Sequence, residues 1–163
     1  MPKLPRLKQT SRLTNDSIND DGDVFQTPAF MEAIVAGYAL VAHADGEVTR
    51  TERRRLMFIA LTEPRLAYFS QEEIAEEFAN HESNFDLDVE VAIEIAYEKV
   101  CLMKNRPRGA QAVVEACRLA IVADSTLHPS EFSEINRIAG LLDLNVSNSL
   151  SHPTIEVPFY NIR

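Results

Sequence analysis

The chain of 163 residues has no tryptophan, only five glycines and only two cysteines. Two cysteines do not make a disulfide framework, so we expect Cys101 and Cys117, which lie in apolar stretches, to be reduced, buried thiols in a cytoplasmic protein. The glycines are isolated from one another, which excludes a glycine-rich phosphate-binding loop. No nucleophile elbow or cysteine–histidine pairing is recognisable either, so the sequence predicts no enzyme and no organic cofactor.

The chain also lacks a long hydrophobic run. Its apolar stretch at residues 33–42 has ten uncharged residues, too few to span a bilayer. Several acidic residues precede this stretch, whereas a signal peptide needs a basic leader. We therefore expect no export signal and no direct insertion into a membrane.

Basic residues are missing from residues 70–98, which contain ten acidic side chains. The whole chain has 25 acidic and 16 basic residues and a net charge of −9, so the remainder, with 15 acidic and 16 basic residues, is almost neutral. An acidic surface repels nucleic acids and anionic lipids, which excludes both as the main partner. Cations and basic proteins remain as partners.

Helical periodicity, punctuated by proline and by capping residues, predicts an all-α fold. Thr49 with Glu52, and Ser70 with Glu73, have the spacing of capping boxes. The fourth helix is expected to place Val89, Ile93, Ala96 and Val100 on one face. The expected helices cover residues 28–44, about 50–63, 71–81, 87–104, 107–124 and 129–142.

The chain divides into three parts by composition. Residues 1–26 are predicted to be a flexible N-terminal arm, and residues 27–145 a compact domain of six to seven helices. In residues 146–163, Ile155, Val157 and Phe159 alternate with other residues, which predicts an extended C-terminal tail. This tail either crosses the helices or reaches a second subunit of a homodimer.

An internal repeat becomes visible when the chain is shifted by 79 residues. The shift aligns Asp45 with Asp124 and Glu52 with Glu131, and four apolar positions around them also match. Each half then contains an apolar helix, a turn that opens on Asp, and a helix whose third residue is Glu. We predict two pseudo-symmetric helix-turn-helix hairpins whose long helices pack together.

The acidic residues of these two turns allow two interpretations. Residues 45–48 with Glu52 match the second half of an EF-hand loop, but the first half lacks its carboxylates, so neither turn is an EF-hand. Either the acids cap turns and helices, or oxygen ligands from the two turns meet and bind a hard divalent cation. His43 and His128, each close to one turn, are the alternative ligands for a transition metal, although the four histidines show no zinc-motif spacing.

Residues 42–48 (AHADGEV) with Glu52, and residues 120–124 (AIVAD) with Glu131, resemble the two signature turns of the TerB-like tellurite-resistance family. The resemblance covers about residues 28–145. It implies an all-helical, pseudo-twofold domain with acidic clusters proposed to bind metal ions. It also implies a role in bacterial resistance to tellurite and chemical stress, with membrane-associated protein partners. The positions that match the family's acidic residues are the candidate metal ligands Asp45, Glu47, Glu52, Asp124 and Glu131.

Three functions follow from these observations. The first is a non-enzymatic module that binds a divalent cation, calcium or magnesium rather than zinc, and docks protein partners. The second is a pure interaction scaffold whose acids only cap helices. The third, a metal-dependent hydrolase, needs a general base in a cleft that the sequence does not supply. The basic run Arg53–Arg55 is either a solvated face or a docking surface for an acidic helix, such as the chain's own Glu-rich segment in a homodimer.

Overall fold

A computed structural model of the protein describes residues 23–46, 48–122 and 128–144. The predicted all-α class is confirmed, because this part of the chain contains six α-helices and no strand. The expected C-terminal tail and nearly all of the expected N-terminal arm lie outside the described residues, as do the candidate ligands Glu47 and Asp124. In order, the elements are η1 (Val24–Gln26), α1 (Pro28–Ala42), α2 (Arg50–Thr62), η2 (Pro64–Leu66), α3 (Gln71–Leu87), α4 (Val89–Cys101), α5 (Pro107–Val122) and α6 (Pro129–Leu141).

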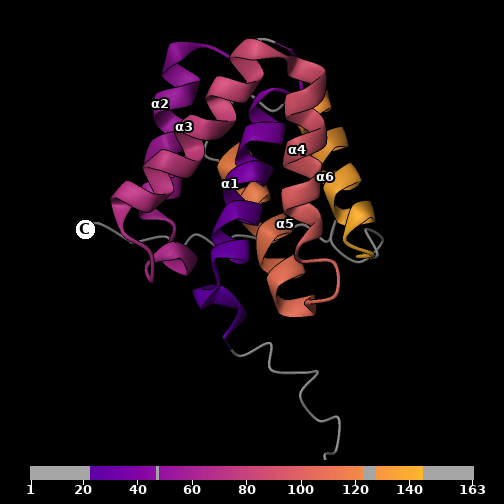
Figure 1. Ribbon diagram of the computed structural model, residues 1–163. Coiled ribbons are helices and arrows are strands. Elements are labelled where there is room, and N and C mark those ends of the chain that lie inside the picture. The colour runs from indigo at the N-terminus through magenta and orange to yellow at the C-terminus, as the bar shows by residue number, and fades with distance from the viewer. Residues whose placement is uncertain (1–22, 47, 123–127, 145–163) are drawn as a thin grey trace, which may run out of the picture.

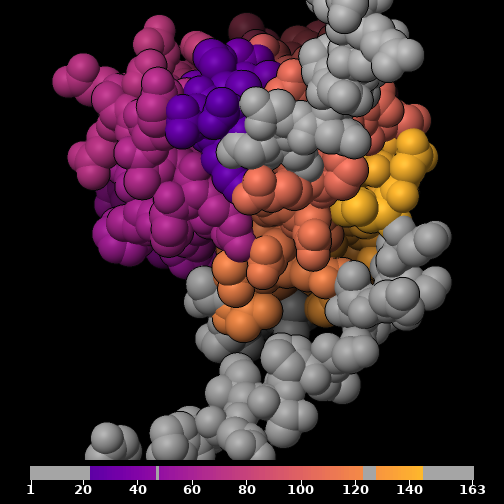
Figure 2. Space-filling view, turned by 90° about the horizontal axis from the view of Figure 1, so that it is seen from below, coloured from indigo at the N-terminus to yellow at the C-terminus, as the bar shows by residue number. Residues whose placement is uncertain are grey.

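The six helices run alternately up and down (Figure 1). The ends of α1 and α3 and the starts of α2 and α4 therefore lie at the upper end of the bundle in this view, where α5 also ends and α6 begins. Seen from the lower end, the first residues of α1 lie between the side formed by α2 and α3 and the start of α5 (Figure 2). The helix ends that flank the two turns marked by the sequence thus lie at one end of the molecule.

Helix α1 forms the centre of the core. Its only charged residue is Glu32, and eleven of its fifteen residues are buried, as the sequence predicts. Gly37 allows α5 to approach closely, because a Cβ atom at this position would lie 2.7 Å from Sγ of Cys117. This contact confirms that the long helices of the two hairpins pack together.

Equivalent positions of the repeat have equivalent roles in the two hairpins. Leu56 on α2 and its counterpart Ile135 on α6 are 5% and 3% exposed, and Ala60 and Ala139 are buried as well. Glu52 and Glu131 occupy the same third position of α2 and α6. The repeat seen in the sequence therefore corresponds to the α1–α2 and α5–α6 hairpins.

Three expectations about element boundaries and burial are wrong. The third helix continues beyond His81 to Leu87, because a buried stripe of Phe78, His81 and Phe85 continues along α3 until Asp88 caps α4. The ordered structure begins before residue 27, since Val24 in η1 is only 1% exposed. Cys117 is buried as expected, but Cys101 at the end of α4 is only partly covered.

The buried face of α4 also differs from the prediction. It consists of Ala92, Ala96 and Val100, with Ile93 partly buried beside it, whereas Val89 is 51% exposed. Val89 is the first residue of α4, at the corner where α3 ends, so it projects beyond the core that covers the later turns. Among the residues that the structure describes, no helix is long and apolar enough to cross a membrane.

Candidate cation site between the two hairpins

Three of the five predicted ligands line one small pocket. Asp45 lies in the turn after α1, Glu52 in the first turn of α2 and Glu131 in the first turn of α6. Val41, Leu56 and Ala120 contribute apolar walls from α1, α2 and α5. The cavity measures about 20 Å³, which is enough for one water molecule or one bare ion. The two halves of the repeat therefore meet at this pocket, as the second interpretation of the acidic turns requires.

Both glutamates of the pocket also stabilise the helices that carry them. Oε2 of Glu52 accepts hydrogen bonds from the backbone N–H of Thr49 at 2.7 Å and from its hydroxyl at 2.8 Å. The hydroxyl of Thr49 in turn accepts from the backbone N–H of Glu52, which completes the predicted capping box. Oε2 of Glu131 accepts from the backbone N–H of His128 at 3.2 Å. Among the described residues, each of the two glutamates makes these capping bonds through Oε2.

Among the described residues that line the pocket, Arg55 on α2 is the single basic one. Its positive charge offsets one of the three carboxylates from Asp45, Glu52 and Glu131, so these four side chains have a formal charge of −2. A divalent cation has the opposite charge. Arg55 was not a predicted site residue, because three consecutive arginines in the sequence give no sign of which one turns inward.

The described side chains alone do not form a complete metal centre. In residues 23–46, 48–122 and 128–144, no three His, Cys, Asp or Glu side chains are grouped closely enough to hold an ion. The two remaining candidates, Glu47 and Asp124, are neighbours of the pocket in sequence but lie outside these ranges. The oxygen donors and the charge of the pocket fit a hard divalent ion, whereas the described donor set is incomplete without the two turns.

Comparison with known protein families identifies the chain. The family described as tellurite resistance protein TerB matches residues 31–151, which is most of the 163-residue chain. The chain belongs to the TerB family. No curated protein and no solved structure matches the chain. The resemblance noted in the sequence is therefore confirmed, and the match covers both hairpins of this TerB-family protein and the two helices between them.

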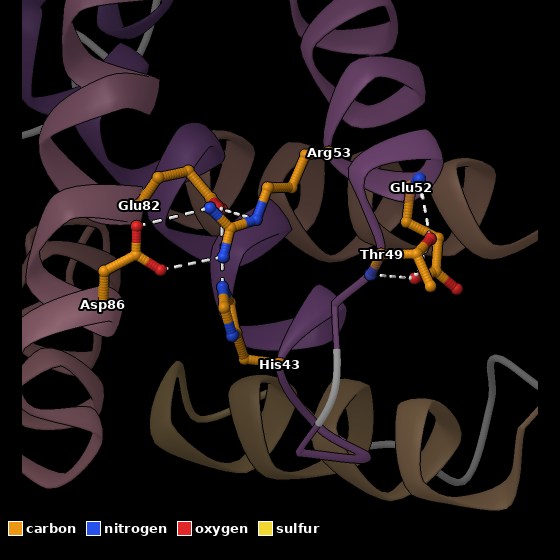
Figure 3. Close-up of polar contacts among 6 residues, drawn as sticks. All are labelled: His43, Thr49, Glu52, Arg53, Glu82 and Asp86. Atoms are coloured by element: carbon orange, nitrogen blue, oxygen red, sulfur yellow. Dashed lines mark hydrogen bonds and ion pairs between the residues drawn. The ribbon is translucent and has the colours of Figure 1, made fainter.

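A cluster of charged residues ties the first TerB hairpin to α3 (Figure 3). Nε of Arg53 lies 2.8 Å from Oε2 of Glu82, and its terminal nitrogens bind the Asp86 carboxylate at 2.9 and 3.4 Å. His43 stacks on Phe85, with ring centroids 3.8 Å apart and an interplanar angle of 3°. Nε2 of His43 also lies 3.4 Å from Oε1 of Glu82. In this TerB-family chain both ends of the α1–α2 turn are thereby fixed against α3.

This cluster decides between the two interpretations of the arginine run. Consecutive helical residues point about 100° apart, so Arg53 reaches α3, Arg54 is exposed and Arg55 lines the pocket. Figure 3 shows Arg53 and Glu52 pointing to opposite sides of α2. The run does contact the Glu-rich segment, but through Arg53 and within one chain. The arginine beside Asp86 also lowers the pKa of this carboxyl group.

Proposed function

We propose that this TerB-family protein is a non-enzymatic module of bacterial tellurite and chemical-stress resistance that binds one divalent cation between its two hairpins. It acts in the cytoplasm, where it docks protein partners, including membrane-associated ones, and does not bind nucleic acid. The observation that carries the proposal is the convergence of Asp45, Glu52 and Glu131, from both halves of the repeat, on one pocket.

The chemistry of the lining supports calcium or magnesium rather than zinc. All potential ligands among the described lining residues are carboxylates, and no histidine or cysteine is present there. Hard cations prefer such oxygen donors, whereas zinc is usually bound by nitrogen and sulfur. In the proposed complex, Glu47 and Asp124 complete the donor set, and Arg55 offsets the excess of negative charge.

A second candidate is an interaction scaffold without a metal. It is favoured by the hydrogen bonds of Glu52 and Glu131 to the starts of their helices, which give both glutamates a structural role in the absence of an ion. The two candidates differ in one measurable respect. Only the first makes the stability of the folded protein depend on a divalent ion, since a ligand that binds the native state alone raises the melting temperature.

Calorimetric titrations and thermal melts of the full chain with calcium, magnesium, manganese and zinc test the proposal. We expect binding of at least one hard cation and a matching rise in melting temperature. No heat and no shift with any of the four ions up to millimolar concentrations would support the scaffold instead.

The variants Glu52→Gln and Glu73→Gln separate ligation from capping. Glu73 forms a capping box of nearly the same geometry with Ser70 on α3, at 2.8 and 2.9 Å, but does not line the pocket. Glutamine preserves a capping box, so both variants should remain folded. Loss of an outer-shell partner weakens metal binding about 10- to 100-fold, so loss of the direct ligand Glu52 should cost at least as much. Glu73→Gln should leave ion binding unchanged.

A further inference from the structure

The outward side of α4 and the corner that precedes it expose a mixed acidic and apolar surface. We define the α4 face by the apolar residues Leu87, Val89, Val91, Ile95 and Leu102 and the acidic residues Asp88, Glu90, Glu94 and Glu98. Four of the apolar side chains are strongly exposed: Leu87 by 85%, Val89 by 51%, Val91 by 49% and Leu102 by 45%. Acidic and apolar residues alternate strictly along residues 86–91, all of which are exposed.

Of the acidic residues on this surface, Asp88 caps the start of α4 through hydrogen bonds from the backbone N–H groups of Glu90 and Val91. Glu90, Glu94 and Glu98 follow one another at intervals of four residues on α4, and none forms an ion pair with another described residue. Like charges at this spacing repel one another weakly. Contiguous exposed apolar side chains rimmed by polar residues mark interaction surfaces in soluble proteins. The α4 face therefore has the features of a binding surface for a segment that is both basic and apolar.

The first thirteen residues of the chain have this complementary composition. They contain four basic residues, Lys3, Arg6, Lys8 and Arg12, three leucines and no acidic residue. Each leucine directly follows a basic residue, as Leu87, Val89 and Val91 each directly follow an acidic one. We propose that residues 1–13 dock on the α4 face of their own chain. The four basic side chains then face the four acidic ones, and the leucines cover the exposed apolar residues.

The path of the chain allows this contact. The guanidinium carbon of Arg108, in the first turn of α5, lies 5.1 Å from the ring centroid of Phe25 in η1. The described chain therefore begins beside the connection from α4 to α5. Nine residues, 14–22, join the basic segment to Asp23 and extend to at most about 30 Å. Helix α4, with thirteen residues, is about 20 Å long. The segment therefore reaches the whole α4 face without leaving its own molecule.

Docking of the basic segment has a consequence for partner binding. A basic partner protein would compete with residues 1–13 for the α4 face. The contact then acts as an internal competitor, which a partner must displace.

A paramagnetic label on Cys101 tests this contact in the full chain. Cys101 is partly exposed at the end of α4, whereas Cys117 is fully buried, so the label attaches at one place. We expect the backbone amide signals of residues 3–13 to lose most of their intensity. The signals should recover at about 1 M salt, where the screening length falls to about 3 Å.

Two charge-reversal variants make the test specific. Glu94→Lys with Glu98→Lys should abolish the broadening, whereas Glu72→Lys with Glu76→Lys, an exposed pair of the same spacing on α3, should preserve it. Absence of broadening in the unmodified sequence, or equal loss in both variants, would overturn the proposal. Broadening that appears only between labelled and unlabelled molecules would show that a second copy supplies the segment, which also overturns docking within one chain.

Discussion

The guanidinium of Arg53 on α2 lies 2.8 Å from the carboxylate of Glu82 on α3, and the side chain of Glu82 is only 11% exposed. The neighbour of Arg53 in sequence is Glu52, which lines the pocket between the hairpins. The pair therefore fixes the start of α2, and with it one wall of the candidate cation site, against the acidic helix. Because Arg53 is the main cationic partner of the buried Glu82 carboxylate, the contact between α2 and α3 should be sensitive to mutation of Arg53.

Replacement of Arg53 by alanine should destabilise the protein by about 1–3 kcal/mol, because it leaves the buried Glu82 carboxylate without its main cationic partner. Arg54→Ala is the matched control, since Arg54 is exposed on the same turn and should change stability by no more than about 0.5 kcal/mol. Urea unfolding of both variants measures the difference. Equal effects would show that the contact between Arg53 and Glu82 contributes nothing beyond helix propensity.

Close packing between the hairpins makes Gly37 hard to replace. In Gly37→Ala the new Cβ atom would lie 2.7 Å from Sγ of Cys117, and such overpacking costs about 1–3 kcal/mol. Gly140 on α6 has no atom within 4 Å of the same position, so Gly140→Ala should instead stabilise the protein by about 0.4–1 kcal/mol. Thermal or urea unfolding checks both signs. A stabilising Gly37→Ala would contradict the described approach of α1 and α5.

The buried His81 should make the protein sensitive to mild acid. Burial, and secondarily the charge of Lys99, lowers the pKa of His81 below 6.5, against the opposing effect of Glu82 and Glu32. As pH falls below about 6.5, His81 binds a proton in the unfolded chain more readily than in the folded protein. The free energy of unfolding therefore decreases. His81→Leu should therefore lose less stability than the unmodified protein between pH 6.5 and 5.5, as measured by urea unfolding at each pH.

Glu77, whose carboxylate lies 3.3 Å from His81, contributes in the opposite direction. Burial raises the pKa of Glu77, so the folded protein binds a proton more readily than the unfolded chain above pH 4.5, and acid stabilises this group. Glu77→Gln removes that compensation and should make the loss of stability in acid steeper. A shallower loss in this variant would contradict the assignment.

The order and the class of the elements follow from local signals. Thr27 and Thr49 have the side-chain hydrogen bonds that their positions predict, and Ser70 begins α3 in the same way. These signals act within one helical turn, so a sequence reveals them directly. The exposure of Val89 and the end of α3 at Leu87 could not be predicted in this way. Both depend on where the neighbouring helices stop covering these residues.

The candidate site was predictable in part for the same reason. The repeat paired Glu52 with Glu131 and Asp45 with Asp124, and packing of the hairpins brings Asp45, Glu52 and Glu131 to one pocket. Arg55 and the pair of Arg53 with Glu82 were not identified as parts of the site. Each depends on the rotation of α2 relative to distant helices, and an arginine run appears the same in sequence whichever side chain turns inward.

Anomalous scattering from crystals grown with saturating Mn²⁺ is the most direct test of a divalent cation site between the two hairpins. We predict an anomalous peak in the pocket lined by Asp45, Glu52 and Glu131, and its loss in crystals of Glu52→Gln but not of Glu73→Gln. A map without a peak in this pocket, or with manganese bound only elsewhere, would contradict the proposal and leave the acids of the two turns as helix caps.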